Sequence, residues 1–64
     1  MRITYLRQRM DEEFGSIRAT ALSHDHVFAE LGGRTVNEAL EAGIEPKQVW
    51  TAVCATFEVP EERR

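Results

Sequence analysis

The segment from residue 32 to residue 46 is crowded with residues that start and stop α-helices. Thr35 and Glu38 have the spacing of a capping box, in which each side chain accepts a hydrogen bond from the other residue's backbone N–H. Gly43 can end the helix that begins there, and Pro46 suits the first turn of the next helix. These signals exclude a long helix or a strand and restrict this segment to short helices joined by tight turns.

Apolar residues recur at helical spacing elsewhere, and no stretch alternates for long enough to form a strand. We predict a first helix over about residues 5–14, capped by Thr4 and ended by Gly15, with an apolar stripe that continues to Ile17. A last helix is predicted over about residues 46–58. The predicted fold class is all-α: a single compact domain of four or five short helices that ends in a helical hairpin.

The signals between these helices are weaker. Ser16 can cap a short helix that would bury three residues, Ile17, Ala21 and Leu22. Asp25 or Ser23 can cap a further two-turn helix, ended by Gly32 and Gly33, with three residues directed inward, Val27, Phe28 and Leu31. Residues 60–64 are expected to form a solvated tail.

A chain of 64 residues is near the lower limit for a core that stands alone. A protein of this mass buries roughly 60 % of its unfolded surface and keeps about 4,200 Å² exposed. The lone Cys54 cannot form an intrachain disulfide, so packing must hold the core together. No apolar run approaches the roughly 20 residues of a membrane span, and the N-terminal run is charged where a signal peptide is apolar. We therefore expect a cytoplasmic protein with no membrane partner.

The residues that could support catalysis or bind a metal do not form a complete set. His24, Asp25 and His26 resemble a metal-binding fragment, but zinc needs three or four ligands in fixed geometry, and only Cys54 and scattered carboxylates remain. Cys54 lies on the apolar stripe of the last helix, which favours an inert buried thiol over a nucleophile paired with His26. We predict no catalytic residue, no cofactor and no metal site, and hence a protein that is not an enzyme.

Four residues are candidate contacts for a protein partner or an anion: Arg34, Thr35, Arg7 and Arg9. Arg34 and Thr35 follow a glycine pair at the start of a helix, where backbone N–H groups, a guanidinium and a hydroxyl would favour an anion. A helix stop followed by a helix start is the simpler interpretation of this run. Arg7 and Arg9 could belong to a basic patch with Arg2 and Arg18, although i,i+4 pairs with Asp11 and Glu13 would give a solvated, salt-bridged face instead.

The turn at residues 43–45 lies between two capped helices, as in a DNA-reading helix-turn-helix. Lys47, Gln48 and Thr51 would then be the nucleic-acid contacts. Residues 34–58 contain two cationic side chains against four carboxylates, a net charge of −2, and the whole chain has a net charge of −3. Because phosphate contacts supply much of the affinity of such proteins, this charge opposes the interpretation. Nucleic-acid binding is kept as the alternative to an ordinary helical hairpin.

Short runs along nearly the whole chain resemble a known family: Glu12-Glu13-Phe14-Gly15, Asp25-His26-Val27, Leu31-Gly32-Gly33-Arg34-Thr35, Glu38-Ala39-Leu40-Glu41-Ala42-Gly43 and Phe57-Glu58-Val59-Pro60. They are similar to an actinobacterial family of very small proteins catalogued as a domain of unknown function. The resemblance implies a compact helical protein in the cytoplasm, encoded near the genes for RecA recombinase and its regulator RecX. It assigns no catalytic or ligand residues. Our leading hypothesis is a non-enzymatic helical module that binds an unidentified protein partner.

Overall fold

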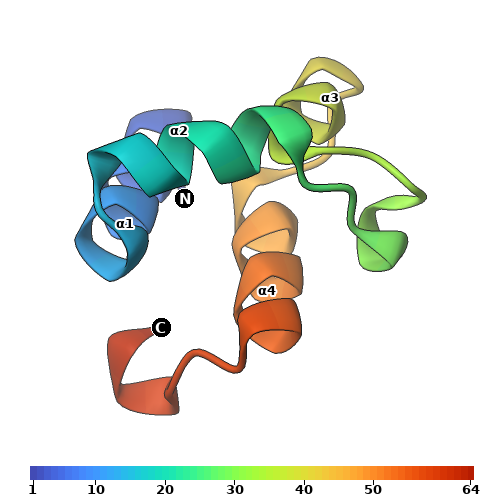
Figure 1. The fold of residues 1–64 in the computed structure, drawn as a ribbon. Helices are drawn as coiled ribbons and strands as arrows, with labels where there is room; N and C mark the ends of the chain where they lie inside the picture. The colour runs from blue at the N-terminus through green and yellow to red at the C-terminus, as the bar shows by residue number, and fades with distance from the viewer.

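A computed structural model describes residues 1–64, and its four α-helices surround one core (Figure 1). The helices are α1 (Ile3–Phe14), α2 (Ser16–Asp25), α3 (Val36–Glu41) and α4 (Pro46–Phe57), with two short 3-10 turns, η1 (Ala29–Leu31) and η2 (Glu61–Arg63). The predicted all-α class is confirmed. The exposed surface of 4200 Å² also equals the value expected for a folded chain of this mass. None of the helices combines the length and the hydropathy that a membrane crossing requires.

The core is built around α4, which runs away from α2 in the view of Figure 1. This helix contributes five of the thirteen buried core residues, Val49, Trp50, Ala52, Val53 and Cys54. The remaining eight come from every other part of the chain except η2: Leu6, Met10, Ala19, Phe28, Leu31, Val36, Ala39 and Val59. Because α1, α2, η1 and α3 all contribute to one cluster, burial of apolar surface ties the short helices together.

The predicted helix boundaries of the hairpin are confirmed. The Thr35 hydroxyl accepts a hydrogen bond from the Glu38 backbone N–H at 3.1 Å, and the Glu38 carboxylate accepts one from the Thr35 N–H at 2.9 Å. Both halves of the capping box are therefore present. Pro46 is the first residue of α4, where its missing N–H costs nothing.

The turn between α3 and α4 is a Schellman motif. The N–H of Ile44 donates to the carbonyl of Ala39 at 3.0 Å, and the N–H of Gly43 donates to the carbonyl of Leu40 at 3.1 Å. Gly43 has a φ of 87°, which a side chain would disfavour. Ile44 packs against the core from this turn, so the motif fixes the angle between the two helices.

The start of the chain departs from the prediction. Thr4 does not cap α1, which already includes Ile3 and has Arg2 at its N-cap without a side-chain hydrogen bond. Gly15 does end α1, but its φ of 83° turns the chain directly into α2. Because the helix axis changes there, the apolar stripe does not continue, and Ile17 is 89 % exposed.

The helix α2 is longer than predicted and buries a different face. Its buried residues are Ala19 and Ser23, whose small side chains allow close packing, whereas Ala21 is exposed and Leu22 packs at the edge of the core. The Ser23 hydroxyl donates to the Ala19 carbonyl at 2.8 Å, which satisfies its hydrogen-bonding requirement. Of the three residues predicted to be buried, only Leu22 contacts the core, so the prediction was wrong for Ile17 and Ala21.

A tight loop follows α2 in place of the predicted two-turn helix. The N–H of Phe28 donates to the carbonyl of Arg34 at 3.0 Å, which forms an isolated antiparallel bridge. Phe28 and Leu31 are buried as predicted, but Val27 precedes the bridge in the extended segment and is 57 % exposed. One 3-10 turn, η1, occupies the loop, and Gly32 ends it in the left-handed conformation.

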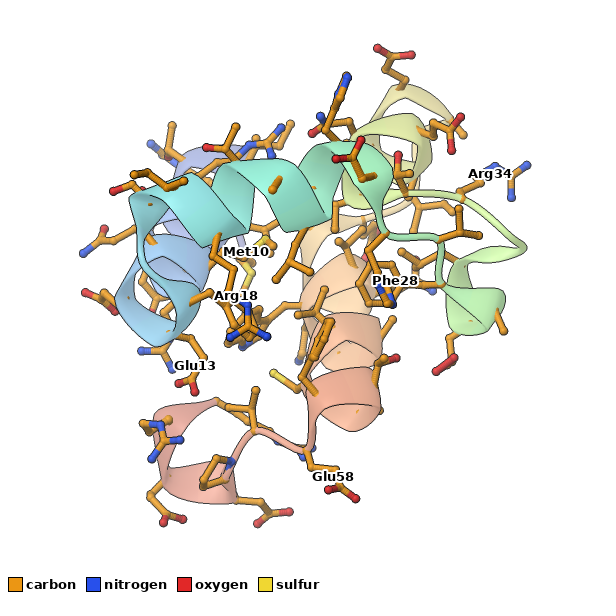
Figure 2. The ribbon with its side chains drawn as sticks, viewed as in Figure 1. Met10, Glu13, Arg18, Phe28, Arg34 and Glu58 are labelled. Carbon is orange, nitrogen blue, oxygen red and sulfur yellow. The ribbon has the colours of Figure 1, made fainter.

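The C-terminal segment, residues 59–64, folds back toward the end of α1 (Figure 1). Arg63 forms an ion pair with Glu13, with 2.8 Å between Nε and Oε1, and Figure 2 shows Glu13 facing this segment. Arg9 Nη2 donates to the Arg63 carbonyl at 3.0 Å, and Trp50 Nε1 donates to the Arg64 carbonyl at 3.2 Å. Residues 61–64 are exposed, as expected of a tail, but these bonds tie them to α1 and α4, which the sequence did not predict.

Candidate functional site

An open groove of about 490 Å³ lies along α4 beside η1, and we refer to it as the η1–α4 groove. Its apolar lining consists of Leu31, Ile44, Ala52 and Ala55, and its polar lining consists of Glu30, Glu45, Lys47, Gln48 and Thr51. The volume lies within the range of about 300–1,000 Å³ that is typical of binding sites. A hollow of about 600 Å³ beside the N-terminus, with Met1, Ile3 and Leu40 in its lining, also meets this criterion. We take the η1–α4 groove as the candidate site because it also contains residues that the sequence predicted as contacts.

One face of α4 forms the groove because of residue spacing. Gln48, Thr51, Ala52 and Ala55 follow one another at steps of three, one and three, so their side chains lie on the same side of the helix. Two of these four residues are alanines, and their small side chains leave a hollow between longer neighbours. A helix face that serves only solubility is usually lined by charged or polar residues.

The loop that carries η1 forms the other side of the groove. The Phe28–Arg34 bridge holds this loop closed, and Leu31 is anchored in the core. The Thr56 hydroxyl also donates to the Glu30 carboxylate at 3.4 Å, which connects α4 to η1 directly. Core packing and these polar contacts therefore fix both sides of the groove.

The three predicted nucleic-acid contacts, Lys47, Gln48 and Thr51, all lie in the η1–α4 groove and are exposed. The groove also contains the carboxylates of Glu30 and Glu45, so its formal charge is −1 from one cation and two anions. The Thr51 hydroxyl donates to the Lys47 carbonyl at 2.9 Å, which commits its proton to the helix backbone. The structure thus groups the three residues but surrounds them with negative charge.

Arg34 and Thr35 support the loop that they occupy. Arg34 lies at the edge of the molecule (Figure 2), and its Nη1 donates to the Leu31 carbonyl at 3.1 Å. A side chain at Gly32 would place its Cβ only 2.6 Å from that same Nη1 atom. Thr35 is buried, and its hydroxyl belongs to the capping box. These bonds account for both residues within the fold, and a partner contact by either stays a prediction.

Arg7 and Arg9 point to different parts of the molecule. Arg7 Nη2 donates to Asn37 Oδ1 in α3 at 2.8 Å, whereas Arg9 Nη2 donates to the carbonyl of Arg63. The expected i,i+4 pairs within α1 are wrong, because the only ion pair joins Glu13 to Arg63. Arg9 also lies 5.6 Å from the centre of the Tyr5 ring. The four candidate partner contacts are therefore spread over separate surfaces.

Of the two residues considered for catalysis, Cys54 is buried and His26 is half-buried against aromatic rings. The His26 ring lies 4.6 Å from the Phe28 ring and 5.1 Å from the Phe57 ring, measured between centroids. Cys54 is fully buried, and this burial raises the pKa of its thiol. A reactive cysteine needs the opposite shift, since the thiolate is the nucleophile. No group of three potential metal-ligating side chains lies together in residues 1–64.

Sequence reasoning missed the apolar half of the groove. The sequence analysis names neither Ile44 nor Ala55 as a candidate contact, although both line the groove. A usable signal was present, because Ala52 and Ala55 are two small residues three positions apart on an otherwise polar face. Arg63 had no such signal, since its partner Glu13 lies 50 residues away in the chain.

Comparison with known proteins places the chain in a family. The model of the family described as "Protein of unknown function (DUF3046)" matches residues 1–62, so the chain belongs to the DUF3046 family. A similar protein from Mycobacterium tuberculosis strain H37Rv is named "Putative envelope-preserving system protein Rv2742c" and is 47 % identical over 36 residues. That match covers 56 % of the chain but only 13 % of the relative. No solved structure matches the chain.

Proposed function

We propose that this chain is a non-enzymatic helical module that binds another protein through the η1–α4 groove. The observation that carries the proposal is the groove itself, a preformed hollow whose apolar lining residues are surrounded by charged and polar ones. Apolar hollows with polar edges are typical of protein-binding surfaces, where a side chain of the partner fills the hollow and excludes water. The family description assigns no activity that competes with this proposal.

The lining also indicates how a partner would bind. The alanines of α4 leave room for one or two large apolar side chains, as when a partner helix or extended segment lies across a groove. Lys47 and the two glutamates at the groove provide charges of both signs. Such charges contribute to the orientation and the specificity of a complex more than to its affinity.

A matched pair of substitutions tests the proposal. Thr51 lies in the groove and Thr20 lies on α2, and both are exposed threonines whose hydroxyls donate to the carbonyl four residues earlier at 2.9 Å. We expect Thr51→Arg to abolish capture of a stoichiometric partner from host lysate, because the long charged side chain occupies the hollow. Thr20→Arg should leave capture unchanged. Equal capture by both variants would contradict the proposal.

Nucleic-acid binding through Lys47, Gln48 and Thr51 is the alternative, and the same surface tests it. Duplex DNA added at low salt would shift backbone amide signals of α4, and these shifts would vanish at higher salt. The negative formal charge of the groove leads us to expect an unchanged spectrum. Salt-sensitive shifts confined to these residues would favour the alternative over a protein partner.

The cellular setting forms part of the proposal. A cytoplasmic location is supported by the lone buried cysteine, because structural disulfides are common in oxidising compartments. The predicted position of the gene near those for RecA and RecX directs the search toward DNA-damage conditions. The relative's name refers to an envelope-preserving system, so lysates from cells under envelope stress belong in the same experiment.

A further inference from the structure

A smaller pocket, of about 300 Å³, lies where α1, α2 and α3 meet. It is lined by five polar residues, Arg7, Thr20, Ser23, His24 and Asn37, and by no apolar residue. None of the five carries a carboxylate, although the chain has more acidic than basic side chains. A polar pocket without negative charge in an acidic protein suits an anionic ligand.

The hydrogen bonds of the pocket determine which groups can contact a ligand. Arg7 Nη2 donates to Asn37 Oδ1 at 2.8 Å, which orients the guanidinium and leaves its other N–H groups and the amide N–H₂ of Asn37 as donors. The hydroxyls of Thr20 and Ser23 donate to backbone carbonyls at 2.9 and 2.8 Å, so their protons are already committed. His24 supplies a third donor side chain, because an imidazole carries at least one N–H.

We propose that this pocket binds a phosphate-class oxyanion, either free phosphate or the phosphate monoester of a small metabolite. Arg7, His24 and Asn37 come from α1, α2 and α3, so three donors reach the pocket from three directions. A guanidinium recognises the planar pair of oxygens on a phosphate group better than a point charge does. The fold holds Arg7 in place through Asn37 before any ligand arrives, which lowers the entropic cost of binding.

The carboxylate of Asp11 lies near this pocket, and its negative charge disfavours an anionic ligand. Asp11 lines a smaller hollow of about 30 Å³ that shares Arg7, Thr20 and Ser23 with the pocket. It forms no ion pair with Arg7, but its charge reduces the positive potential there. Replacement of this carboxylate by the neutral amide in Asp11→Asn should therefore strengthen phosphate binding.

The pocket is separate from the η1–α4 groove, since the two have no lining residue in common. Failure of phosphate binding would leave the protein-binding proposal intact, and the reverse also holds. This inference therefore does not depend on the proposed function.

The test is a titration of the ¹⁵N-labelled chain with inorganic phosphate at constant ionic strength and at a slightly alkaline pH, where the ligand is mainly the dianion. We expect saturable shifts of the backbone amides of residues 20–24 and 37. Arg7→Gln should weaken binding at least about tenfold, because it removes the charge and the planar donor pair. Arg2→Gln removes an equal charge from an exposed residue outside the pocket and should leave the affinity unchanged.

His24→Gln provides a second variant, since the His24 side chain makes no hydrogen bond within the fold and its replacement should not impair folding. We expect it to weaken binding several-fold. Acetate should bind more weakly than phosphate, and titration with O-phosphoserine distinguishes a monoester ligand from free phosphate. Shifts that follow ionic strength, that are equal for acetate and phosphate, or that persist unchanged in Arg7→Gln would overturn the proposal.

Discussion

At the scale of single residues, Gly32 shows how one side chain depends on the absence of another. Gly32 and Gly33 have similar φ values of 73° and 76°, so both occupy the left-handed region. A Cβ at Gly33 would meet open space, whereas one at Gly32 would approach Arg34 Nη1 to 2.6 Å. That nitrogen donates to the Leu31 carbonyl, so the glycine leaves room for a side-chain hydrogen bond within the loop.

This comparison predicts different costs for two similar substitutions. Gly33→Ala should lower the free energy of unfolding by about 1 kcal/mol, the usual cost of a left-handed alanine. Gly32→Ala should cost about 1 kcal/mol more, because Arg34 must move and lose its hydrogen bond. Urea denaturation measures both values. In an Arg34→Ala background the two substitutions should cost the same, and a gap that persists there would contradict the assignment.

The capping box gives a second prediction at a single residue. Thr35→Ala leaves the Glu38 N–H without its side-chain acceptor and should destabilise the protein by about 1 kcal/mol. Thr35→Ser keeps the hydroxyl and should recover most of that loss. The midpoints of urea unfolding report both effects. If serine and alanine had equal effects at this position, the cap would not contribute to stability.

At the scale of secondary-structure elements, the sequence patterns that correctly predicted helix boundaries were local ones. The boundaries of α3 and α4 could be predicted because a capping box, a Schellman glycine and an N1 proline act within a few residues of the helix end. The buried face of α2 could not be predicted in this way. Close packing on α1 buries the small residues Ala19 and Ser23 and leaves the more apolar Ile17 exposed. The loop after α2 depends on a backbone bridge between Phe28 and Arg34, for which no side-chain pattern exists.

The C-terminal segment supplies a prediction about pH. The hydrogen bond from Arg63 holds the pKa of Glu13 below its ordinary value of 4.5, against an opposing effect of desolvation. Because the folded pKa is depressed, the stabilisation is complete above pH 4.5 and is lost as the pH falls through the folded pKa. Glu13→Gln should therefore be less stable than the unmodified chain at neutral pH, and the difference should disappear in acid.

Chemical denaturation at several pH values measures this difference. Glu12→Gln is the matched control, because Glu12 is the neighbouring glutamate and accepts a hydrogen bond only from Gln8, at 3.3 Å. We expect its effect to vary less with pH than that of Glu13→Gln. A Glu13→Gln effect that is constant from neutral pH to well below 4.5 would show that the ion pair does not stabilise the fold.

At the scale of the whole molecule, α4 belongs both to the core and to the candidate site. Its inner face supplies Val49, Val53 and Cys54, and its outer face lines the η1–α4 groove. Three of its polar residues, Lys47, Gln48 and Thr51, could be singled out from the sequence because they follow a clear helix start. The hollow itself could not be predicted, because it forms only when η1 folds back beside α4. No local sequence pattern indicates the position of that loop.

The lone cysteine reports on the integrity of this core. Cys54 is fully buried, and burial raises the pKa of its thiol, so we expect negligible reaction with a thiol reagent at neutral pH. The thiol should react rapidly once urea unfolds the chain. The measurement is the rate of modification followed by mass spectrometry across the unfolding transition. Modification of the native protein at the rate of a free thiol would contradict the packing of α4.

Site-specific cross-linking tests the central claim of a protein-binding groove most directly. Gln48 lines the groove and Gln8 is an exposed glutamine on α1, so a photoreactive residue at each position compares the groove with a second exposed helix surface. We predict that irradiation in host cells joins one partner to the Gln48 position and none to the Gln8 position, and that Thr51→Arg removes the product. Equal cross-linking from both positions, or a Gln48 product that Thr51→Arg leaves unchanged, would contradict the account.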